Sequence, residues 1–576
     1  MRISLTKSQL RTQGFALALT LVFGSLTLLV LASALGWSAS NLRLNFRNNQ
    51  YFRTVSAAEA ATEGVISRLE TDYLAGGEAL VQTHLDLYRQ AVPSPSENDL
   101  WANYRFSDHQ GQTGRNLVQP VGVTEFRALS AQYKGLNGYA ASFRIVSDAS
   151  EANTQFNVVA GVQQDVETAT IPLFQFAIFY NMDLEINPGP QMTVNGPVHC
   201  NATIYCQPQD TLTFQSDVTA AGSLVSGKKP GDPVVRTPGT IVYQAEHDAG
   251  VSSLTVPVGT NNNPAVVRQV VEVPPANEPF NSDMGKQRYY NKADLIIKVT
   301  DSGVVATSGV ANNFGTTIPS DQVAQFVNPN VTFFNKRENQ TIQATQVDVA
   351  KLRQWDQTNS VLRSSLSFGT IRTLYVADQR TQTGSTESGV RLINGETLLP
   401  QGLTVATPNP LYVKGNYNAP AADRGTTNTA QTLPASLVAD AITLLSPNWT
   451  DANSTAGLSA RIASDTTVNA AFLAGIVPTV EGSYSGGVEN FPRFLEDWSG
   501  STFTYNGSMV VMFESIYATG QWRGTGSTVG IYNPPNRNWA FDTNFRDPSK
   551  IPPGTPSACV LIRQNWVTLA PSSPVL

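Results

Sequence analysis

The sequence of 576 residues predicts an α+β protein that is mainly β. We expect a long N-terminal transmembrane and amphipathic helix, then a small sheet, then a large β-rich, solenoid-like domain. Three observations predict this fold class. Residues 12–42 carry no charge and lead into a proline-free stretch, two alternating apolar runs lie between residues 141 and 161, and very short strand-like runs begin at Ile171.

The composition excludes several classes of protein. Charged residues make up 14% of the chain, against about 25% in typical soluble domains. A coiled coil or a helix-rich enzyme would carry more Glu and Lys on its surface, whereas β-structure tolerates uncharged polar surfaces. The net charge of −6 favours no nucleic-acid partner, three cysteines exclude a disulfide-dense scaffold, and four histidines leave little for a metal site.

The first element is an apolar segment at Phe15–Ala39 that is long enough to cross a bilayer as a helix. Residues 1–58 contain six basic residues and no acidic one, and three of the basic residues precede the apolar segment. By the positive-inside rule the N-terminus stays in the cytoplasm. We therefore expect a single pass through the inner membrane, with the C-terminal domain periplasmic or extracellular.

The helical pattern continues beyond the apolar segment. Residues 41–73 contain no proline and place apolar residues at helical spacing, among them Val55, Val65 and Leu69. The sequence therefore predicts one uninterrupted helix from Phe15 to Tyr73, apolar first and amphipathic second.

Three interpretations of the N-terminus compete. A cleaved secretory signal would use the small residues Ala32-Ser33-Ala34 as its cleavage site. A simple signal anchor would remain uncut. A Gly14-Phe15 pair at the junction of basic leader and apolar run is typical of a third class, a prepilin-type leader.

The continuation of the helix favours the third interpretation. A basic residue at Arg47, aromatic residues at Tyr51-Phe52 and the run Ala57-Ala58-Glu59-Ala60 resemble the PilX-type minor pilins of type IV pili. The resemblance covers about the first 75 residues. It implies that a prepilin peptidase cuts after Gly14 and methylates Phe15. It also implies that the helix packs among other pilin-like subunits, and we expect this filament-core helix to use four apolar residues: Leu19, Phe23, Leu28 and Leu31.

One residue departs from the family pattern. Major pilins carry a glutamate at the fifth position of the mature chain, and counting from Phe15 this position holds Leu19. A subunit without that carboxylate lacks a partner for a neighbouring N-terminal ammonium. Leu19 therefore favours a minor, initiating or tip subunit over a bulk filament subunit.

We expect the chain to divide into five ranges. They are a basic leader (1–14), the long helix and a following helical segment (15–92), a small pilin-like α/β head (93–170), a β-rich, solenoid-like domain (171–450) and a C-terminal β-rich region (451–576). No fixed repeat period is evident in the solenoid-like range, so an irregular sandwich is the alternative there.

The sequence offers little catalytic chemistry, so we expect no enzyme, no cofactor and no metal. It contains no G-x-S-x-G, P-loop, H-E-x-x-H or C-x-x-C motif. Asp183 and Glu185 alternate and would share one face of a strand, as paired carboxylates in a glycosidase do, but solvated strand residues are the simpler interpretation. Cys200 and Cys206 are candidates for a disulfide outside the cytoplasm, with two buried thiols as the alternative.

Three functions follow from these observations. The first is a structural minor pilin or pseudopilin-like subunit of a type IV pilus-type or type II secretion-type filament. The second is a membrane-anchored adhesin or carbohydrate-binding protein, because five of the eight tryptophans lie after residue 448. The third is a β-helix polysaccharide-degrading enzyme that would use Asp183 and Glu185.

Overall fold

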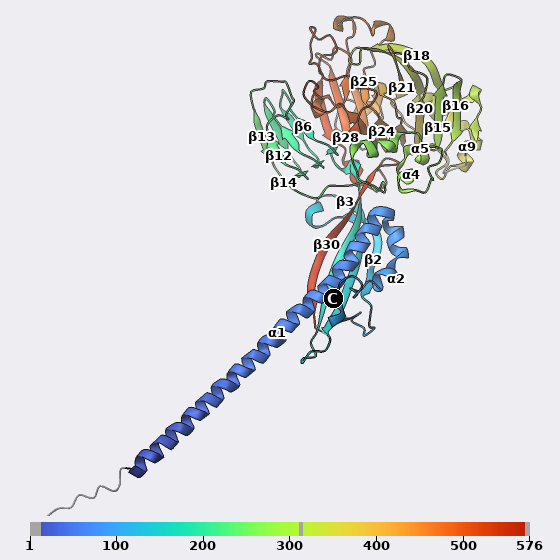
Figure 1. The fold of residues 1–576 in the computed structure, drawn as a ribbon. Coiled ribbons are helices and arrows are strands. Elements are labelled where there is room, and N and C mark those ends of the chain that lie inside the picture. Colours follow the sequence, from blue (N-terminus) through green and yellow to red (C-terminus); the bar gives the residue numbers. More distant parts are fainter. Residues whose placement is uncertain (1–12, 310–314, 571–576) are drawn as a thin grey trace, which may run out of the picture.

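The structure is a computed structural model that describes residues 13–309 and 315–570. One long helix, α1 (Gln13–Thr83), projects from the rest of the molecule as a stalk, and a small sheet lies along its second half (Figure 1). A large β-rich head follows at the far end of that sheet. The helix predicted from Phe15 to Tyr73 is confirmed. Most of the predicted leader, residues 1–12, lies outside the described residues.

The far end of α1 turns back on itself. Gly77 has φ 65° and ψ −162°, a conformation that only glycine adopts readily, and it interrupts the helix. A short helix, α2 (Leu85–Arg89), then packs on α1. Tyr88 donates a hydrogen bond to the Asp72 carboxylate at 2.6 Å, and the same carboxylate lies 2.8 Å from His84 Nδ1. These contacts fix the turn before the chain enters the sheet.

The small sheet is antiparallel and has the strand order β1–β3–β4–β30, with β2 also pairing with β3. Its strands are β1 (Tyr104–Ser107), β2 (Leu117–Ala128), β3 (Asn137–Glu151), β4 (Val159–Pro172) and β30 (Ser557–Leu569). Both predicted strands are present, although the second begins at Val159 and not at Gln155. The sequence did not indicate that β30, from the end of the chain, pairs with β4 in this sheet.

α1 packs on this sheet through one face of its second half. Val65, Ile66 and Leu69 are fully buried and share a core with Phe143 and Val166 of the sheet. Their spacing puts them on one side of the helix, as the amphipathic pattern predicts. The second half of α1 and the small antiparallel sheet therefore share one core.

The head begins with three parallel stacks of short strands. Two of them are separate three-stranded sheets, and the third is part of the large sheet of the head. In this third stack Ile178 pairs with Val198, and Val198 pairs with Val218. In a second sheet Leu184 pairs with Ile204, and Ile204 with Leu224. Side chains 20 residues apart thus stack on one another. The repeat is hard to see in the sequence because only the inward positions must be apolar.

The strands of these parallel sheets are three or four residues long. They are β5 (Ile178–Tyr180), β6 (Leu184–Ile186), β7 (Met192–Val194), β8 (Val198–Cys200), β9 (Ile204–Cys206), β10 (Thr211–Phe214), β11 (Val218–Ala220), β12 (Leu224–Ser226), β13 (Thr240–Tyr243) and β14 (His247–Ala249).

The rest of the head belongs to one large mixed sheet. Parallel pairings run through much of the range 171–450, where a solenoid was predicted, but antiparallel hairpins interrupt them, and the sheet continues to residue 541. The solenoid stays a prediction. The long strand β28 (Thr502–Glu514) pairs in parallel with β26 (Thr466–Ile476), β29 (Asn536–Phe541) and β5. Pairing between segments so far apart in the chain has no local pattern that would predict it. The predicted range boundaries themselves stay predictions.

The other elements of the head are short. Its remaining strands are β15 (Leu295–Thr300), β16 (Gly303–Ser308), β17 (Thr317–Ile318), β18 (Val327–Asn335), β19 (Gln340–Asp348), β20 (Thr373–Asp378), β21 (Thr386–Gly395), β22 (Leu403–Ala406), β23 (Leu411–Tyr417), β24 (Ala435–Ala439), β25 (Ile442–Leu445) and β27 (Arg493–Phe494). Its helices are α3 (Pro264–Arg268), α4 (Asp283–Gln287), α5 (Tyr289–Lys292), α7 (Ser320–Val323), α8 (Val349–Thr358) and α9 (Ser360–Ser365).

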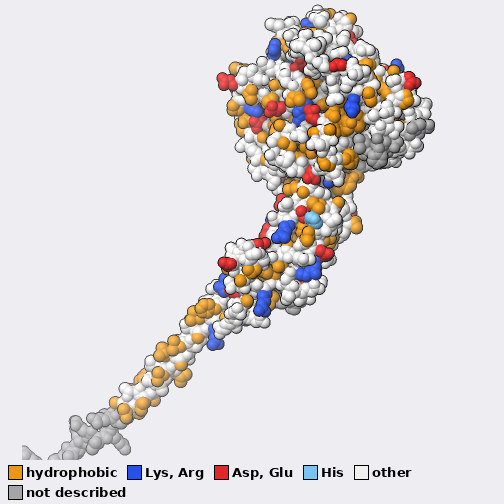
Figure 2. Space-filling model, turned by 45° about the vertical axis from the view of Figure 1, so that its right-hand side comes forward, with side chains coloured by type: hydrophobic (Ala, Val, Ile, Leu, Met, Phe, Trp, Pro, Cys, Tyr) orange, Lys and Arg blue, Asp and Glu red, His pale blue; other side chains and the backbone are white. Residues whose placement is uncertain are grey.

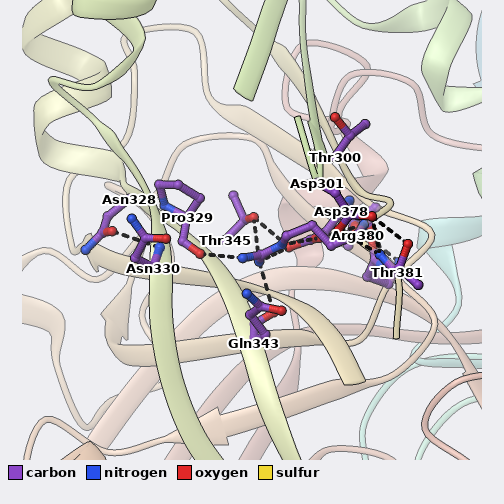
Figure 3. Close-up of polar contacts among 12 residues, drawn as sticks. Thr300, Asp301, Asn328, Pro329, Asn330, Gln343, Thr345, Asp378, Arg380 and Thr381 are labelled. Carbon is purple, nitrogen blue, oxygen red and sulfur yellow. Dashed lines mark hydrogen bonds and ion pairs between the residues drawn. The ribbon is translucent and has the colours of Figure 1, made fainter. Parts of the chain in front are cut away.

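Buried arginines join segments of the head, and Arg380 is the clearest example (Figure 3). Its Nε donates to Asp378 Oδ1 at 2.9 Å, Nη1 donates to the Pro329 carbonyl at 2.7 Å, and Nη2 donates to the Gln343 carbonyl at 3.2 Å. Pro329 lies where a bulge interrupts the pairing of β18 with β19. A planar guanidinium can serve several acceptors at once. Arg380 therefore holds the bulged strand against its neighbours.

Candidate functional site: the exposed half of the long helix

The most prominent surface of the molecule is the apolar first half of α1. The predicted residues Phe15, Leu19, Phe23, Leu28 and Leu31 all lie on it, each with between 45% and 71% of its surface exposed. Hydrophobic side chains continue along the stalk up to the small sheet (Figure 2). A helix that is apolar on every side is normally buried in protein or in lipid. The isolated chain leaves this surface uncovered.

Four hydroxyl groups on this half of the helix, those of Thr20, Ser25, Thr27 and Ser33, donate to carbonyls of the helix itself. Thr20 Oγ1 donates to the Ala16 carbonyl at 2.7 Å, and Ser33 Oγ donates to the Leu29 carbonyl at 2.8 Å. Each of these two bonds runs to a carbonyl four residues earlier, so the polar atoms do not need water. By length and composition, this is the one helix among the described residues that can cross a membrane.

The predicted processing pair lies at the free end of the stalk. Gly14 and Phe15 belong to the first turn of α1, remote from the sheet and the head (Figure 1). A peptidase working at the membrane surface would therefore not meet the folded domains. Cleavage after Gly14 and methylation of Phe15 stay predictions.

The change from exposed to buried helix occurs at Gln50. Its side-chain amide donates to Thr154 Oγ1 at 2.7 Å and to the Phe156 carbonyl at 2.9 Å. One turn later Arg53 forms an ion pair with Glu151 at 3.0 Å. These contacts fix the position where α1 meets the loop between β3 and β4. Sequence reasoning did not single out Gln50, because a glutamine on an amphipathic helix is usually exposed.

The Ala57-Ala58-Glu59-Ala60 run lies where the helix approaches the sheet. Ala57 and Ala58 are buried in a small core that includes Ala149 and Ala160 of β3 and β4. Small side chains allow the helix backbone to approach the strands closely. One turn later, Glu63 forms an ion pair with Arg563 of β30. The motif therefore anchors the stalk to a sheet that includes the end of the chain.

Cys200 and Cys206 are both free and buried in the structure. They end strands of different sheets: Cys200 aligns with Tyr180 and Ala220, whereas Cys206 aligns with Ile186 and Ser226. Burial raises the pKa of the Cys200 thiol to about 12 and also raises that of Cys206. The predicted disulfide is not formed in this structure.

Asp183 and Glu185 line one small cavity of about 10 Å³, which is room for about one water molecule. Asp183 forms an ion pair with Lys229 at 2.9 Å. Glu185 is buried and accepts hydrogen bonds from Thr479 and Ser485, and its desolvation raises its pKa. The structure thus brings the two carboxylates together, but it leaves no space for a sugar between them.

The tryptophans near the C-terminus have different environments. Trp449 and Trp498 are buried in the core, whereas Trp566 on β30 is 48% exposed. Trp539 on β29 is half-buried and lines two adjoining cavities. Among the described residues no three His, Cys, Asp or Glu side chains lie close enough to hold a metal ion.

Comparison with known proteins assigns the chain to no family. No protein-family model matches it, and no curated protein is similar to it. Among solved structures, the chain is similar to the competence-associated pilin ComZ from Thermus thermophilus, with 11% identity and a TM-score of 0.30. The similarity covers 90% of this chain and 97% of that chain. A similarity this weak gives no basis for inferring function. The function is therefore inferred from the geometry of the chain itself.

Proposed function

We propose that this chain is a minor subunit of a bacterial filament of the type IV pilus or type II secretion kind, and that it displays a large extracytoplasmic β-rich head. The observation that carries the proposal is α1. One continuous helix has a first half that is apolar on all sides and uncovered, and a second half that packs on a small antiparallel sheet.

The proposed mechanism is assembly. Before assembly, lipid covers the apolar half of α1, and the small sheet and head lie outside the inner membrane. During assembly the same surface leaves the bilayer and packs against the corresponding helices of other subunits. Both environments are apolar, so the transfer exposes little apolar surface to water. Leu19 offers no carboxylate to a neighbouring N-terminus, which supports a position at the tip or the start of the filament.

The N-terminus of the mature chain tests this proposal. We expect mass spectrometry of the protein recovered from cell envelopes to find a chain that begins at Phe15, with a methyl group on its amine. The substitution Gly14→Val should leave the uncut chain in the membrane and remove it from sheared surface fractions. A mature chain that begins at Leu35 would instead identify a secretory signal and exclude the filament proposal.

A second measurement tests the packing partner. Cysteine introduced at Leu28 should cross-link to another pilin-like subunit in sheared filaments, because this side chain is exposed on the stalk. Cysteine at Leu87, which is exposed beside the small sheet, serves as the matched control and should not cross-link. Cross-linking at neither position, in a chain whose N-terminus is Phe15, would indicate a processed anchor that does not enter a filament.

A further inference from the structure

A groove on the head lies between the strands β7 and β29. Two cavities of about 390 Å³ and about 40 Å³ adjoin there and share three lining residues, Met192, Thr193 and Trp539. We call this the Trp539 groove and define it by Gln191, Met192, Thr193, Asn536, Arg537 and Trp539. Its larger part is within the usual size of small-molecule sites.

The groove is formed by the edges of two sheets. β7 is the outer strand of the sheet β13–β10–β7, and in the described part of the chain β29 pairs with β28 alone. The two edges are held together at one end, where the Phe541 amide donates to Asn195 Oδ1 at 2.7 Å. At the other end Arg537 Nη2 donates to the Glu489 carbonyl at 3.0 Å. The walls are therefore fixed by contacts on both sides of the groove.

Trp539 is held rigidly in this groove. Its ring lies edge-on to Phe503 and Tyr505, with centroid distances of 6.4 and 6.3 Å, and the Arg537 guanidinium lies 5.3 Å from its centre. Aromatic side chains lose little conformational freedom on binding, because few of their bonds rotate. Trp539 therefore offers the groove an apolar side chain that is already fixed in position, with the Arg537 guanidinium beside it.

The polar groups around the ring are mostly uncharged. Gln191 and Asn536 contribute exposed amide side chains, and Thr193 contributes an exposed hydroxyl. Three buried polar atoms of the lining residues, Trp539 Nε1, Arg537 Nε and Glu489 Oε2, have no hydrogen-bond partner among the described residues. Buried polar atoms usually have a partner, and these three atoms belong to residues that line the groove.

We propose that the Trp539 groove binds a neutral oligosaccharide of pyranose units. A pyranose ring has an apolar face of C–H groups that stacks on an aromatic ring, and its hydroxyls both donate and accept hydrogen bonds. The amides, hydroxyl and guanidinium around Trp539 offer both kinds of partner. An anionic polymer fits less well, since Glu489 adjoins the single arginine of the lining. The inference does not depend on filament assembly.

Calorimetric titration of the full chain tests this inference. The protein is held in lauryldimethylamine oxide, a detergent without a sugar headgroup, and titrated with cellohexaose, maltohexaose and chitohexaose. We expect at least one probe to bind with a Kd of about 1 mM or tighter. The variant Trp539→Ala should weaken that binding by about tenfold or more, as expected for an aromatic side chain at the centre of a site.

Two further variants separate binding from folding. Thr193→Arg fills the groove from an exposed position on β7, and it should abolish binding without lowering the melting temperature. Trp566→Ala removes an exposed tryptophan from the small sheet and should leave binding unchanged. Heparin, an anionic polysaccharide, serves as an additional probe. The inference is overturned if none of the three neutral probes binds or if Thr193→Arg binds as the wild type does. It is also overturned if the protein binds heparin alone and added salt abolishes that binding.

Discussion

The stalk and the head of this protein differ in which side chains they expose and which they bury. The first half of α1 exposes large apolar residues such as Phe15 and Trp37, which are more than 70% accessible. The head buries charged residues instead: Arg493 and Glu338 form an ion pair at 2.6 Å with each side chain only 4% exposed. Both arrangements depart from the usual rule that apolar residues lie inside and charges outside.

The difference shows which contacts the chain completes by itself. A buried charge is costly without a partner, and the head supplies partners from its own residues in the pairs Arg268–Asp440 and Arg380–Asp378. An exposed apolar helix has no such partner within the chain. Its cover is lipid or another subunit, so the stalk marks the surface through which this protein joins something else.

A charge placed on the stalk should nearly abolish membrane insertion, which is the largest effect expected on the location of the chain. Leu28→Asp puts a carboxylate near the middle of the apolar segment, where a charged residue costs about 2.5–3.5 kcal/mol on insertion. We expect roughly a hundredfold loss of membrane-inserted chain, measured by carbonate extraction. The conservative variant Leu28→Ile should insert normally. An unchanged membrane fraction for Leu28→Asp would contradict the proposed role of this surface.

Removal of one partner from a buried ion pair in the head should have the largest effect on the stability of the fold. Asp440→Ala leaves the buried Arg268 with Glu272 as its remaining carboxylate and frees the backbone amides of Ile516 and Ala518. We expect the free energy of unfolding of the head to fall by about 3–5 kcal/mol, measured by chemical denaturation followed by tryptophan fluorescence. Asp86→Ala removes an exposed partner and serves as the control. Equal stability of the two variants would show that the buried pair is not needed.

Substitutions in the two halves of α1 should differ in their effect on stability, by a smaller amount. Leu69→Ala removes a fully buried side chain from the core beneath the helix and should destabilise the small sheet by about 3 kcal/mol. Leu29→Ala makes the same change on the exposed half and should leave the stability of the folded domains unaltered. Hydrogen exchange of the β3 backbone amides measures the stability of both variants. A similar loss in both variants would mean that the exposed half also packs within the chain.

The smallest expected effect is a dependence of head stability on pH. Burial raises the pKa of Glu489 and of Glu496 from 4.5 to about 7. Between these values the folded protein keeps protons that the unfolded chain has released, so stability falls as the pH rises from 5 to 8. We expect Glu489→Gln to reduce this fall by about 2 kcal/mol.

His199 has the opposite effect on the pH dependence of stability. Its contribution must therefore be separated from that of Glu489. Burial lowers the pKa of the His199 ring to about 4, so the folded state favours the neutral ring and loses stability as the pH falls below 6.5. The comparison of Glu489→Gln with the wild type at each pH cancels the contribution of His199. A wild type that gains stability between pH 5 and 8 as strongly as the variant would disprove the assignment to Glu489.

Much of the stalk was predictable from the sequence alone. The absence of charge from residue 12 to 42, the absence of proline and the apolar spacing at Val65 and Leu69 all follow from local chemistry, and the structure has the helix that they predict. The short strand-like runs expected from Ile171 onward were also visible, and short strands such as β7 lie in that part of the chain. The predicted filament-core residues are exposed, as an interface that is still uncovered requires.

The tertiary structure alone decided how distant segments meet. β30 returns to the small sheet, β28 pairs with β5, and Trp539 lies opposite Met192 only because β29 and β7 become neighbours. None of these pairings has a local cause, since a strand's alternation indicates which face is buried but not which strand lies beside it. The sequence by itself therefore determined the helix, its apolar surface and many strands. The mixed sheet and the groove depended on contacts across hundreds of residues, where only packing and backbone pairing select the partner.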